Sequence, residues 1–221
     1  MKAKGKGIRY ETPEGPEVEF QPGSRGRVLR NLLAITKKME MDSVEYNALL
    51  HTQKIYLGLI GPDTRFTADM IREMHRQWLS GIYSWAGTYR TVELQKGSFR
   101  WPPAFRVGDN MHTFEEGILR LNTPCRAGAL ETVARRMAEV HGELLLIHPF
   151  RDGNGRLARW IADLMALQAG LPAPKYEFEG NKQRVRRDAY LSAVSRAYAQ
   201  DYEALADFFA KAIEARLAEV P

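Results

Sequence analysis

The segment from His148 to Arg159, HPFRDGNGRLAR, combines residue types that suit chemistry on phosphates. A histidine titrates near neutral pH, so His148 can accept a proton from an attacking hydroxyl. Asp152 offers a carboxylate to a hard cation such as Mg²⁺, which would bridge phosphate oxygens. Arg156 and Arg159 can add charge-assisted hydrogen bonds to the same phosphates. The segment therefore predicts a complete phosphate-transfer site.

The backbone of this segment is expected to form a loop between two helices. Pro149 disfavours helical geometry at His148, so the preceding helix should end there. Residues 152–155 tolerate positive φ and are expected to form a tight loop, with a new helix opening at about Gly155 or Arg156. Such a loop and the dipole of the new helix form an anion cradle. The alternative is a plain corner between helices, but a corner needs no base, acid and arginines together.

Apolar and polar periodicity predicts the elements that must position this segment. Helices are expected at 42–57, with Asp42 or Ser43 as N-cap, from near Thr67 through Trp78, and at about 109–121, 130–147, 155–169, 184–198 and 202–218. Residues 85–107 carry strand-forming side chains on both sides of the turn Lys96-Gly97-Ser98, which predicts a β-hairpin. Because β–α alternation and a GxxxxGK[S/T] string are missing, a Rossmann or P-loop sheet is not expected. The predicted fold is a single, mostly α domain with one hairpin.

The composition is that of an ordinary globular protein. The chain has 221 residues, a net charge of +5 and one cysteine, so neither an internal disulfide nor a multi-cysteine zinc site can form. Residues 1–25 are rich in glycine, proline and charge and are interpreted as an N-terminal arm, with the domain over 26–221. Basic residues elsewhere alternate with acids, so nucleic acid is not the expected partner. No signal peptide or membrane span is expected, which favours a cytoplasmic location.

The segment at 148–159 matches the Fic motif H-P-F-x-[D/E]-G-N-[G/K]-R at every defined position, and Arg159 adds a second arginine found in many members. Residues 84–90 (SWAGTYR), Lys96 and Gly97 resemble the family segment at its hairpin "flap". Residues 138–141 resemble the family's preceding helix. The chain is thus similar to Fic (filamentation induced by cAMP) proteins over roughly 27–209, which implies the Fic fold and a protein adenylyltransferase that moves AMP from ATP to a Tyr, Thr or Ser hydroxyl.

The resemblance assigns a role to each matching residue. His148 resembles the catalytic base, Asp152 the Mg²⁺ ligand and Phe150 the buried anchor of the loop. The candidate nucleotide-binding residues are Gly153, Asn154 and Gly155 for the α- and β-phosphates, Arg156 and Arg159 for the β/γ end, and Lys96, Gly97 and Tyr190. For Tyr190, core packing is the alternative to lining an adenine pocket. His141 could pair with His148 on a metal, but a buried, hydrogen-bonded histidine is favoured.

The hairpin, about residues 91–103, resembles the flap that pairs with the target protein by strand addition. Val92, Leu94 and Phe99 are its candidate target-binding residues. The aromatic residues Phe99, Trp101 and Phe105 could form a binding platform, but a role in covering the underside of the flap is favoured.

Many Fic enzymes are restrained by a helix bearing [S/T]-x-x-x-E-[G/N], whose glutamate pairs with the second arginine. Tyr10, His112 and Lys175 stand where that motif needs Ser or Thr, so this inhibitor is not expected within the chain. A separate small inhibitor protein, as in toxin–antitoxin pairs, is the hypothesis, and delivery to another cell's cytosol stays open. The alternatives are transfer of UMP, GMP, phosphocholine or phosphate, removal of AMP, and a non-catalytic binding or regulatory module. Target and oligomeric state are not predictable.

Overall fold

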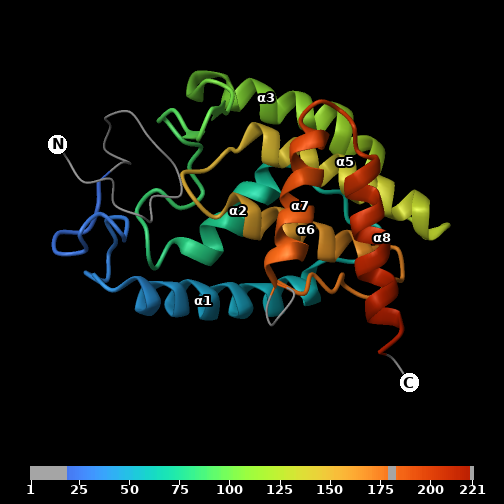
Figure 1. Cartoon of the computed structure of the whole chain (residues 1–221), viewed down its shortest axis with the longest axis horizontal. Coiled ribbons are helices and arrows are strands. Elements are labelled where there is room, and N and C mark those ends of the chain that lie inside the picture. Colours follow the sequence, from blue (N-terminus) through green and yellow to red (C-terminus); the bar gives the residue numbers. More distant parts are fainter. Residues whose placement is uncertain (1–18, 179–182, 220–221) are drawn as a thin grey trace.

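The computed structural model of the chain describes residues 19–178 and 183–219. Its helices, shown in Figure 1, are α1 (Lys38–Leu59), α2 (Ala68–Leu79), α3 (Val107–Phe114), α4 (Arg120–Asn122), α5 (Leu130–Ile147), α6 (Asn154–Gln168), α7 (Gln183–Ala197) and α8 (Glu203–Leu217). The mostly helical fold expected from the sequence is confirmed. Most of the predicted N-terminal arm, residues 1–18, lies outside the described residues.

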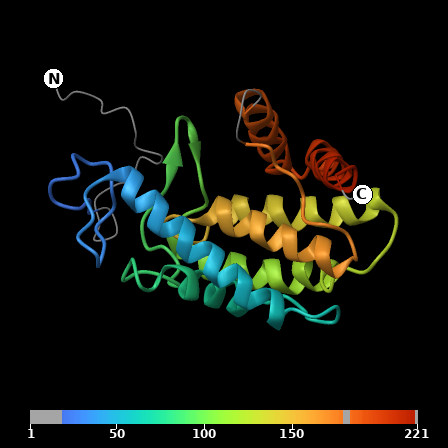
Figure 2. The ribbon, with the colours of Figure 1, turned by 90° about the horizontal axis from the view of Figure 1, so that it is seen from below.

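The centre of the fold is the pair of helices α5 and α6, which run side by side in Figure 2 with α2 and α3 on one side and α7 and α8 on the other. Both central helices place apolar residues at a helical period on their inner faces, among them the fully buried Met137, Leu157 and Ile161. The loop between α5 and α6 carries the residues of the predicted site. These two buried helices therefore hold the site residues in position. No helix within the described ranges is long and apolar enough to cross a bilayer.

The first helix begins earlier than expected. Lys37 is the N-cap of α1 and makes no side-chain capping bond, so the expected caps Asp42 and Ser43 both lie inside the helix. The reason is an ion pair between Lys38 and Asp42, one turn apart, which supports the first turn. In contrast, α2 starts near Thr67 as expected, and Thr67 is its N-cap, because its hydroxyl accepts the N–H of Met70 at 3.1 Å.

The hairpin is present but short. The strands β1 (Gln95–Lys96) and β2 (Phe99–Arg100) pair antiparallel in the register Lys96↔Phe99, so Lys96 belongs to a strand and the turn is Gly97-Ser98. Gly97 has φ 60°, a conformation that favours glycine. One further hydrogen bond joins the two legs of the hairpin, from the N–H of Trp101 to the carbonyl of Leu94, at 3.1 Å. The pairing ends there because proline at 102 has no N–H to donate.

The expected helix at 109–121 consists of three consecutive segments. After α3, residues Glu115–Leu119 form a π-helical turn, which leads directly into α4. This turn was not predicted. It places the Glu115 carboxylate 2.7 Å from the N–H of Ala68, where it caps the first turn of α2.

Candidate active site

His148 is the residue that ends α5. The helix ends before Pro149 as expected, and His148 adopts the left-handed conformation, with φ 52° and ψ 60°. Its Nδ1 lies 3.1 Å from the Leu145 carbonyl oxygen. Because a carbonyl only accepts, Nδ1 carries the proton in the neutral ring, and Nε2 is the nitrogen that can take a proton from a substrate. The ring of Trp101 lies 4.2 Å from the imidazole and donates its Nε1–H to the same carbonyl, at 2.9 Å.

Arg90 holds the backbone at His148 in place, and sequence reasoning did not single it out. Its buried guanidinium donates from Nε to the His148 carbonyl at 2.8 Å, from Nη1 to the Val92 carbonyl at 2.9 Å and from Nη2 to the Pro102 carbonyl at 2.6 Å. The backbone N–H of Arg90 also donates to the Pro149 carbonyl, at 2.8 Å. One side chain therefore joins both legs of the flap to the loop that carries the histidine.

The loop is closed by Asn154 and Phe150. The side-chain amide of Asn154 accepts the Phe150 N–H at 2.9 Å and donates to the Phe150 carbonyl at 2.7 Å. This changes the expected role of Asn154, since its amide is used inside the protein and only its backbone N–H remains for a phosphate. Phe150 is fully buried, as expected of an anchor, and its ring stacks on His75 at 3.9 Å.

His75 is a second positioning residue that the sequence did not reveal as part of the site. Its Nδ1 accepts the N–H of Gly87 at 2.9 Å, so the proton sits on Nε2, which lies 3.1 Å from the Asp152 carbonyl. Burial lowers the pKa of His75 to about 4, because the charged ring would be desolvated. The carbonyl that His75 binds belongs to the loop at residues 148–153, so this buried ring helps to hold the loop.

The start of α6 forms the expected anion cradle, with different bounds. Gly153 is the N-cap, with φ 86°, and the helix opens at Asn154, so Asn154 and Gly155 belong to its first turn and not to the loop. A Cβ on residue 153 would lie 3.0 Å from the ring of Trp78, so glycine is required by both conformation and space. The N–H groups of Asn154 and Gly155 have no acceptor within the described part of the chain. Free N–H groups at a helix start bind anions.

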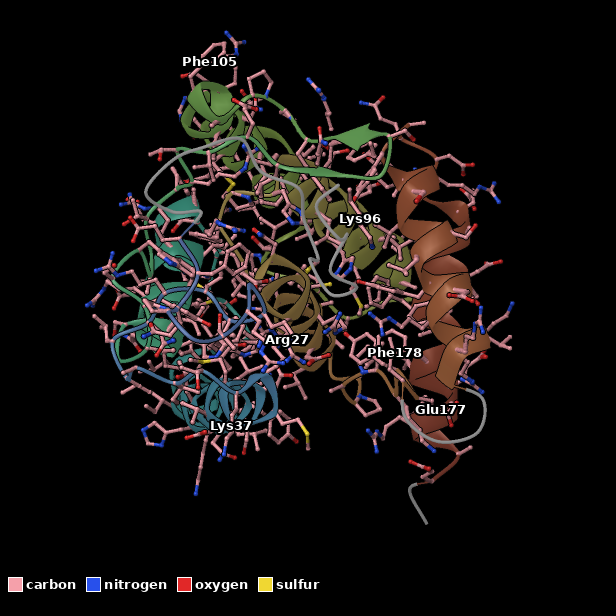
Figure 3. The ribbon with its side chains drawn as sticks, turned by 60° about the vertical axis from the view of Figure 1, so that its left-hand side comes forward. Arg27, Lys37, Lys96, Phe105, Glu177 and Phe178 are labelled. Carbon is pink, nitrogen blue, oxygen red and sulfur yellow. The ribbon has the colours of Figure 1, made fainter. Side chains whose placement is uncertain are left out.

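A pocket of about 390 Å³ lies beside this helix start. It is lined by Lys96, Trp101, Leu145, His148, Gly155, Arg159, Phe178, Arg187, Tyr190, Leu191, Val194 and Tyr198. Lys96 from the hairpin and Phe178 both face the side of α7 in Figure 3. Three cationic side chains, Lys96, Arg159 and Arg187, therefore meet the base and the helix start around one concave space. The volume is that of an ordinary small-molecule site. Arg187 was not predicted, because an exposed arginine on a helix gives no sequence signal.

The two motif arginines are separated by the structure. Arg159 lines the pocket, with its guanidinium carbon 5.5 Å from the ring centre of Phe178. Arg156 turns to the opposite side, where its Nη1 is 2.5 Å from Oε2 of Glu45. Arg156 pairs with Glu45 and does not line the pocket, so its expected contact with the β/γ end of a nucleotide stays a prediction. Its partner on α1 lies 111 residues away in sequence and could not be inferred from the motif.

Asp152 fits the role of a single metal ligand. Its side chain is partly exposed, and its Oδ1 accepts the N–H of Gly153 at 2.6 Å. No group of three or more His, Cys, Asp or Glu side chains in the described ranges could form a cage for a metal. Mg²⁺ is usually held by one or two carboxylates together with substrate phosphates, so one carboxylate beside a phosphate cradle suits that ion.

Contrary to the expectation, the flap side chains do not all point outward to where a target could bind. Val92 and Leu94 are buried in a small cluster with Trp101, and Phe99 packs against it. Leu94 is 1% exposed, so Val92 and Leu94 cannot contact another protein through their side chains. Phe99 and Trp101 cover the underside of the flap as favoured. Phe105 does not, since it is 82% exposed and points into solvent at the edge of the molecule in Figure 3.

Tyr190 packs in the core and also lines the pocket, while its contact with adenine stays a prediction. Its ring lines the pocket and is buried, while its hydroxyl lies 2.7 Å from Nε2 of His141. His141 is thus the buried, hydrogen-bonded histidine that was favoured over a metal ligand. Burial lowers its pKa to about 3, so it is neutral at physiological pH.

A helical fold whose central loop presents a base, an acid and a helix N-terminus beside a cationic pocket defines a phosphate-transfer class of protein. A sequence model of the Fic/DOC family matches residues 65–166, which include α2, the flap, α5 and most of α6. Over these residues the chain is similar to the Fic/DOC family.

Two curated relatives are similar over most of the chain. "Probable protein adenylyltransferase y4lH" of Sinorhizobium fredii is 29% identical over 201 residues, 90% of this chain and 96% of that protein. "Protein adenylyltransferase VbhT" of Bartonella schoenbuchensis is 26% identical over 162 residues, 73% of this chain. The match spans only 33% of VbhT, so that relative is about three times longer than the region it shares.

The fold is also that of solved Fic structures. The crystal structure of the Bartonella tribocorum effector BepC, which has AMPPNP bound, superposes with a TM-score of 0.67 at 16% identity, covering 83% of this chain and 91% of that one. At this identity the likeness establishes the shared fold and not a shared activity.

Proposed function

We propose that this protein is an adenylyltransferase, which moves AMP from ATP to a hydroxyl of another protein. The observation that carries the proposal is the placement of His148. The hydrogen bond from Nδ1 to Leu145 leaves Nε2 as the basic nitrogen, and the histidine shares a pocket with Gly155 at the helix start and with Arg159. The names of the relatives y4lH and VbhT support the same activity.

The proposed reaction uses these groups in one step. Nε2 of His148 takes the proton of the target hydroxyl, whose oxygen forms a bond to the α-phosphorus as the bond from that phosphorus to the β-phosphate oxygen breaks. Pyrophosphate leaves. The N–H groups at the start of α6 and the cations Lys96, Arg159 and Arg187 stabilise the charge that develops on the phosphates. Asp152 would hold Mg²⁺, which supplies further positive charge to the phosphate oxygens.

The nucleoside is proposed to lie against α7. Tyr190, Leu191 and Val194 give the pocket an apolar wall on α7. An apolar wall with a few polar groups is what a base needs, while the cationic side chains suit the phosphates. Gly97 lies at the tip of the flap and does not line the pocket, so its proposed contact with the nucleotide needs movement of the flap.

The target is proposed to add a strand to the flap. Because Lys96 and Phe99 close the two-residue turn as a hydrogen-bonded pair, the backbone groups of Arg100, the next residue of β2, point to the outer edge of the hairpin. Main-chain pairing would then place a target hydroxyl near the pocket without using the buried Val92 and Leu94.

Restraint is proposed to come from a separate small protein. Within the described residues Arg159 forms no ion pair with a carboxylate, and the sequence lacks the inhibitory motif. Within the part of the chain that the structure describes, Glu45 pairs with Arg156 and not with Arg159. The reaction is expected in a cytosol, that of the producing cell or of a cell that receives the protein. A purified chain that becomes active only after one of its own glutamates is replaced would contradict this part of the proposal.

The experiment that tests the function is incubation of the purified protein with α-labelled ATP, Mg²⁺ and a cell lysate. We expect label on a lysate protein with the wild type and none with His148→Ala. The variant must bind ATP as the wild type does, which shows that the pocket is intact. Binding without any transfer in the wild type would favour a non-catalytic module, and label from UTP or GTP in place of ATP would favour another transfer.

A further inference from the structure

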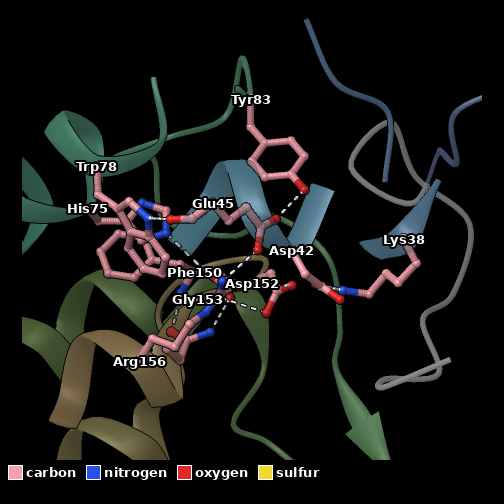
Figure 4. Close-up of polar contacts among 11 residues, drawn as sticks. Lys38, Asp42, Glu45, His75, Trp78, Tyr83, Phe150, Asp152, Gly153 and Arg156 are labelled. Carbon is pink, nitrogen blue, oxygen red and sulfur yellow. Dashed lines mark hydrogen bonds and ion pairs between the residues drawn. The ribbon is translucent and has the colours of Figure 1, made fainter. Parts of the chain in front are cut away.

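A buried carboxylate on α1 joins three elements around the motif loop. Glu45 is 3% exposed. Its Oε1 accepts the hydroxyl of Tyr83 at 2.5 Å, and its Oε2 accepts Nη1 of Arg156 at 2.5 Å (Figure 4). Its backbone carbonyl accepts Nε1–H of Trp78 at 2.9 Å. Every polar group of this glutamate that faces the site is therefore used, and its position is fixed from three directions.

Arg156 is held between this carboxylate and the candidate metal ligand. Its guanidinium carbon lies 4.6 Å from the ring centre of Trp78, and its Nη2 lies 3.9 Å from Oδ2 of Asp152 (Figure 4). Burial opposes its charge, but the nearby Asp152 and Glu45 together raise the pKa of Arg156, so the side chain stays cationic. The pocket wall includes Arg159 but not Arg156.

We propose that Glu45 is a positioning residue that keeps Arg156 off the phosphates and neutralises it beside Asp152. The inference rests on the proposed function, because it concerns how the same site binds Mg²⁺ and ATP. Arg156 then acts as a spacer that orients Asp152, while Arg159 contacts the nucleotide directly. Because Glu45 offsets the charge of Arg156, Arg156 competes less with a cation for the Asp152 carboxylate.

The physical reason is the competition between Arg156 and a metal for the same carboxylate. At 3.9 Å, Nη2 of Arg156 is at the outer limit of an ion pair with Asp152, because Glu45 holds the other end of the guanidinium at 2.5 Å. If Glu45 lost its charge, Arg156 would be an uncompensated buried cation and would pair fully with Asp152. The carboxylate would then be less available to Mg²⁺.

The test compares the affinity for ATP with and without Mg²⁺ by isothermal titration calorimetry, which needs no transfer. For Glu45→Gln we expect the gain in ATP affinity on adding Mg²⁺ to fall by about tenfold, while the affinity without metal stays within about threefold. Tyr83→Phe is the matched control, since it removes the other hydrogen bond to Glu45 and changes no charge. It should keep the full gain.

The double variant Glu45→Gln/Arg156→Gln gives a second, independent test. Removing both charges frees Asp152 again, so the gain on adding Mg²⁺ should return to the wild-type value. This variant also covers the case in which the single variant does not fold, since it leaves no unpaired buried charge. A protein with a merely structural Glu45 would show no such recovery, and that result would overturn the inference.

Two other outcomes are decisive. If Arg156→Gln weakens binding of metal-free ATP as much as Arg159→Gln does, then Arg156 is a phosphate ligand and the inference is wrong, while the proposed function stands. If the wild type binds ATP with no response to Mg²⁺, the proposed metal-assisted function fails, and the inference fails with it.

Discussion

Nε of Arg90 lies 2.8 Å from the backbone carbonyl oxygen of His148, so the flap and the candidate base share one buried side chain. The carbonyls of Val92 and Pro102 accept from the same guanidinium, which ties the position of the flap to that of the histidine.

Replacing Arg90 should therefore damage both folding and transfer. Arg90→Met would remove the guanidinium that donates to the carbonyls of Ile147, His148, Val92 and Pro102, and we expect the free energy of unfolding to fall by about 3 kcal/mol or more. Arg90→Lys should not rescue it, because a single ammonium cannot reproduce the planar fork of donors. Urea unfolding measures the loss. A lysine variant as stable and as active as the wild type would contradict the assigned role.

Arg159 should dominate the affinity for the phosphates. Removing a charge-assisted contact in Arg159→Ala is expected to weaken ATP binding by about tenfold or more, with little change in stability. Arg106→Ala is the matched control, since Arg106 is an exposed arginine outside the pocket. Calorimetric titration distinguishes the two. Equal affinities for both variants would show that the pocket at Arg159 is not the phosphate site.

His75 should make the protein less stable in acid. Its pKa is about 4 in the folded protein and about 6.5 when unfolded, so between these values the unfolded chain binds a proton that the folded chain does not. Stability from this group is complete above pH 6.5 and is lost as the pH falls to 4, by about 3 kcal/mol. His75→Gln should remove that part of the slope in urea unfolding between pH 6.5 and 4. An unchanged slope would contradict it.

The protein should tolerate a change at the exposed Phe105, which follows the flap, but not a change in the buried side chains beneath the flap. Leu94→Ala removes a side chain that is 1% exposed and should destabilise the protein by about 2 kcal/mol or more. Phe105→Ala changes a side chain that is 82% exposed and should alter stability by less than about 0.5 kcal/mol. Thermal unfolding of the two variants decides this. A stable Leu94→Ala protein would mean that the flap core does not hold the hairpin.

The sequence was most informative where chemistry and local geometry coincide. His148 before Pro149 correctly predicted where α5 ends, and the spacing of apolar residues predicted the bounds of α5 itself. The position of Gly153 was predicted as a turn, but the helix start at Asn154 was placed one or two residues too late, because the side-chain bonds of Asn154 to Phe150 were not foreseeable.

The parts that could not be predicted all depend on contacts between distant segments. Glu45, His75 and Arg90 lie 111, 77 and 58 residues from the loop residues they hold, and each lies in a segment without a chemical motif of its own. Periodicity predicts that such residues face inward, but it does not say what they meet. The split between Arg156 and Arg159 follows from the same limit, since their spacing suggests a common ligand until α1 is in place.

The central claim is transfer of AMP, and the most direct measurement follows two labels in one reaction. ATP carrying different isotopes on the α- and γ-phosphates is incubated with the protein, Mg²⁺ and a lysate, and both labels are counted on the modified protein and in the released product. The account predicts that the α-label alone is found on the target, that the γ-label leaves in pyrophosphate, and that His148→Ala abolishes both signals. The γ-label on the target, with ADP as the product, would contradict it.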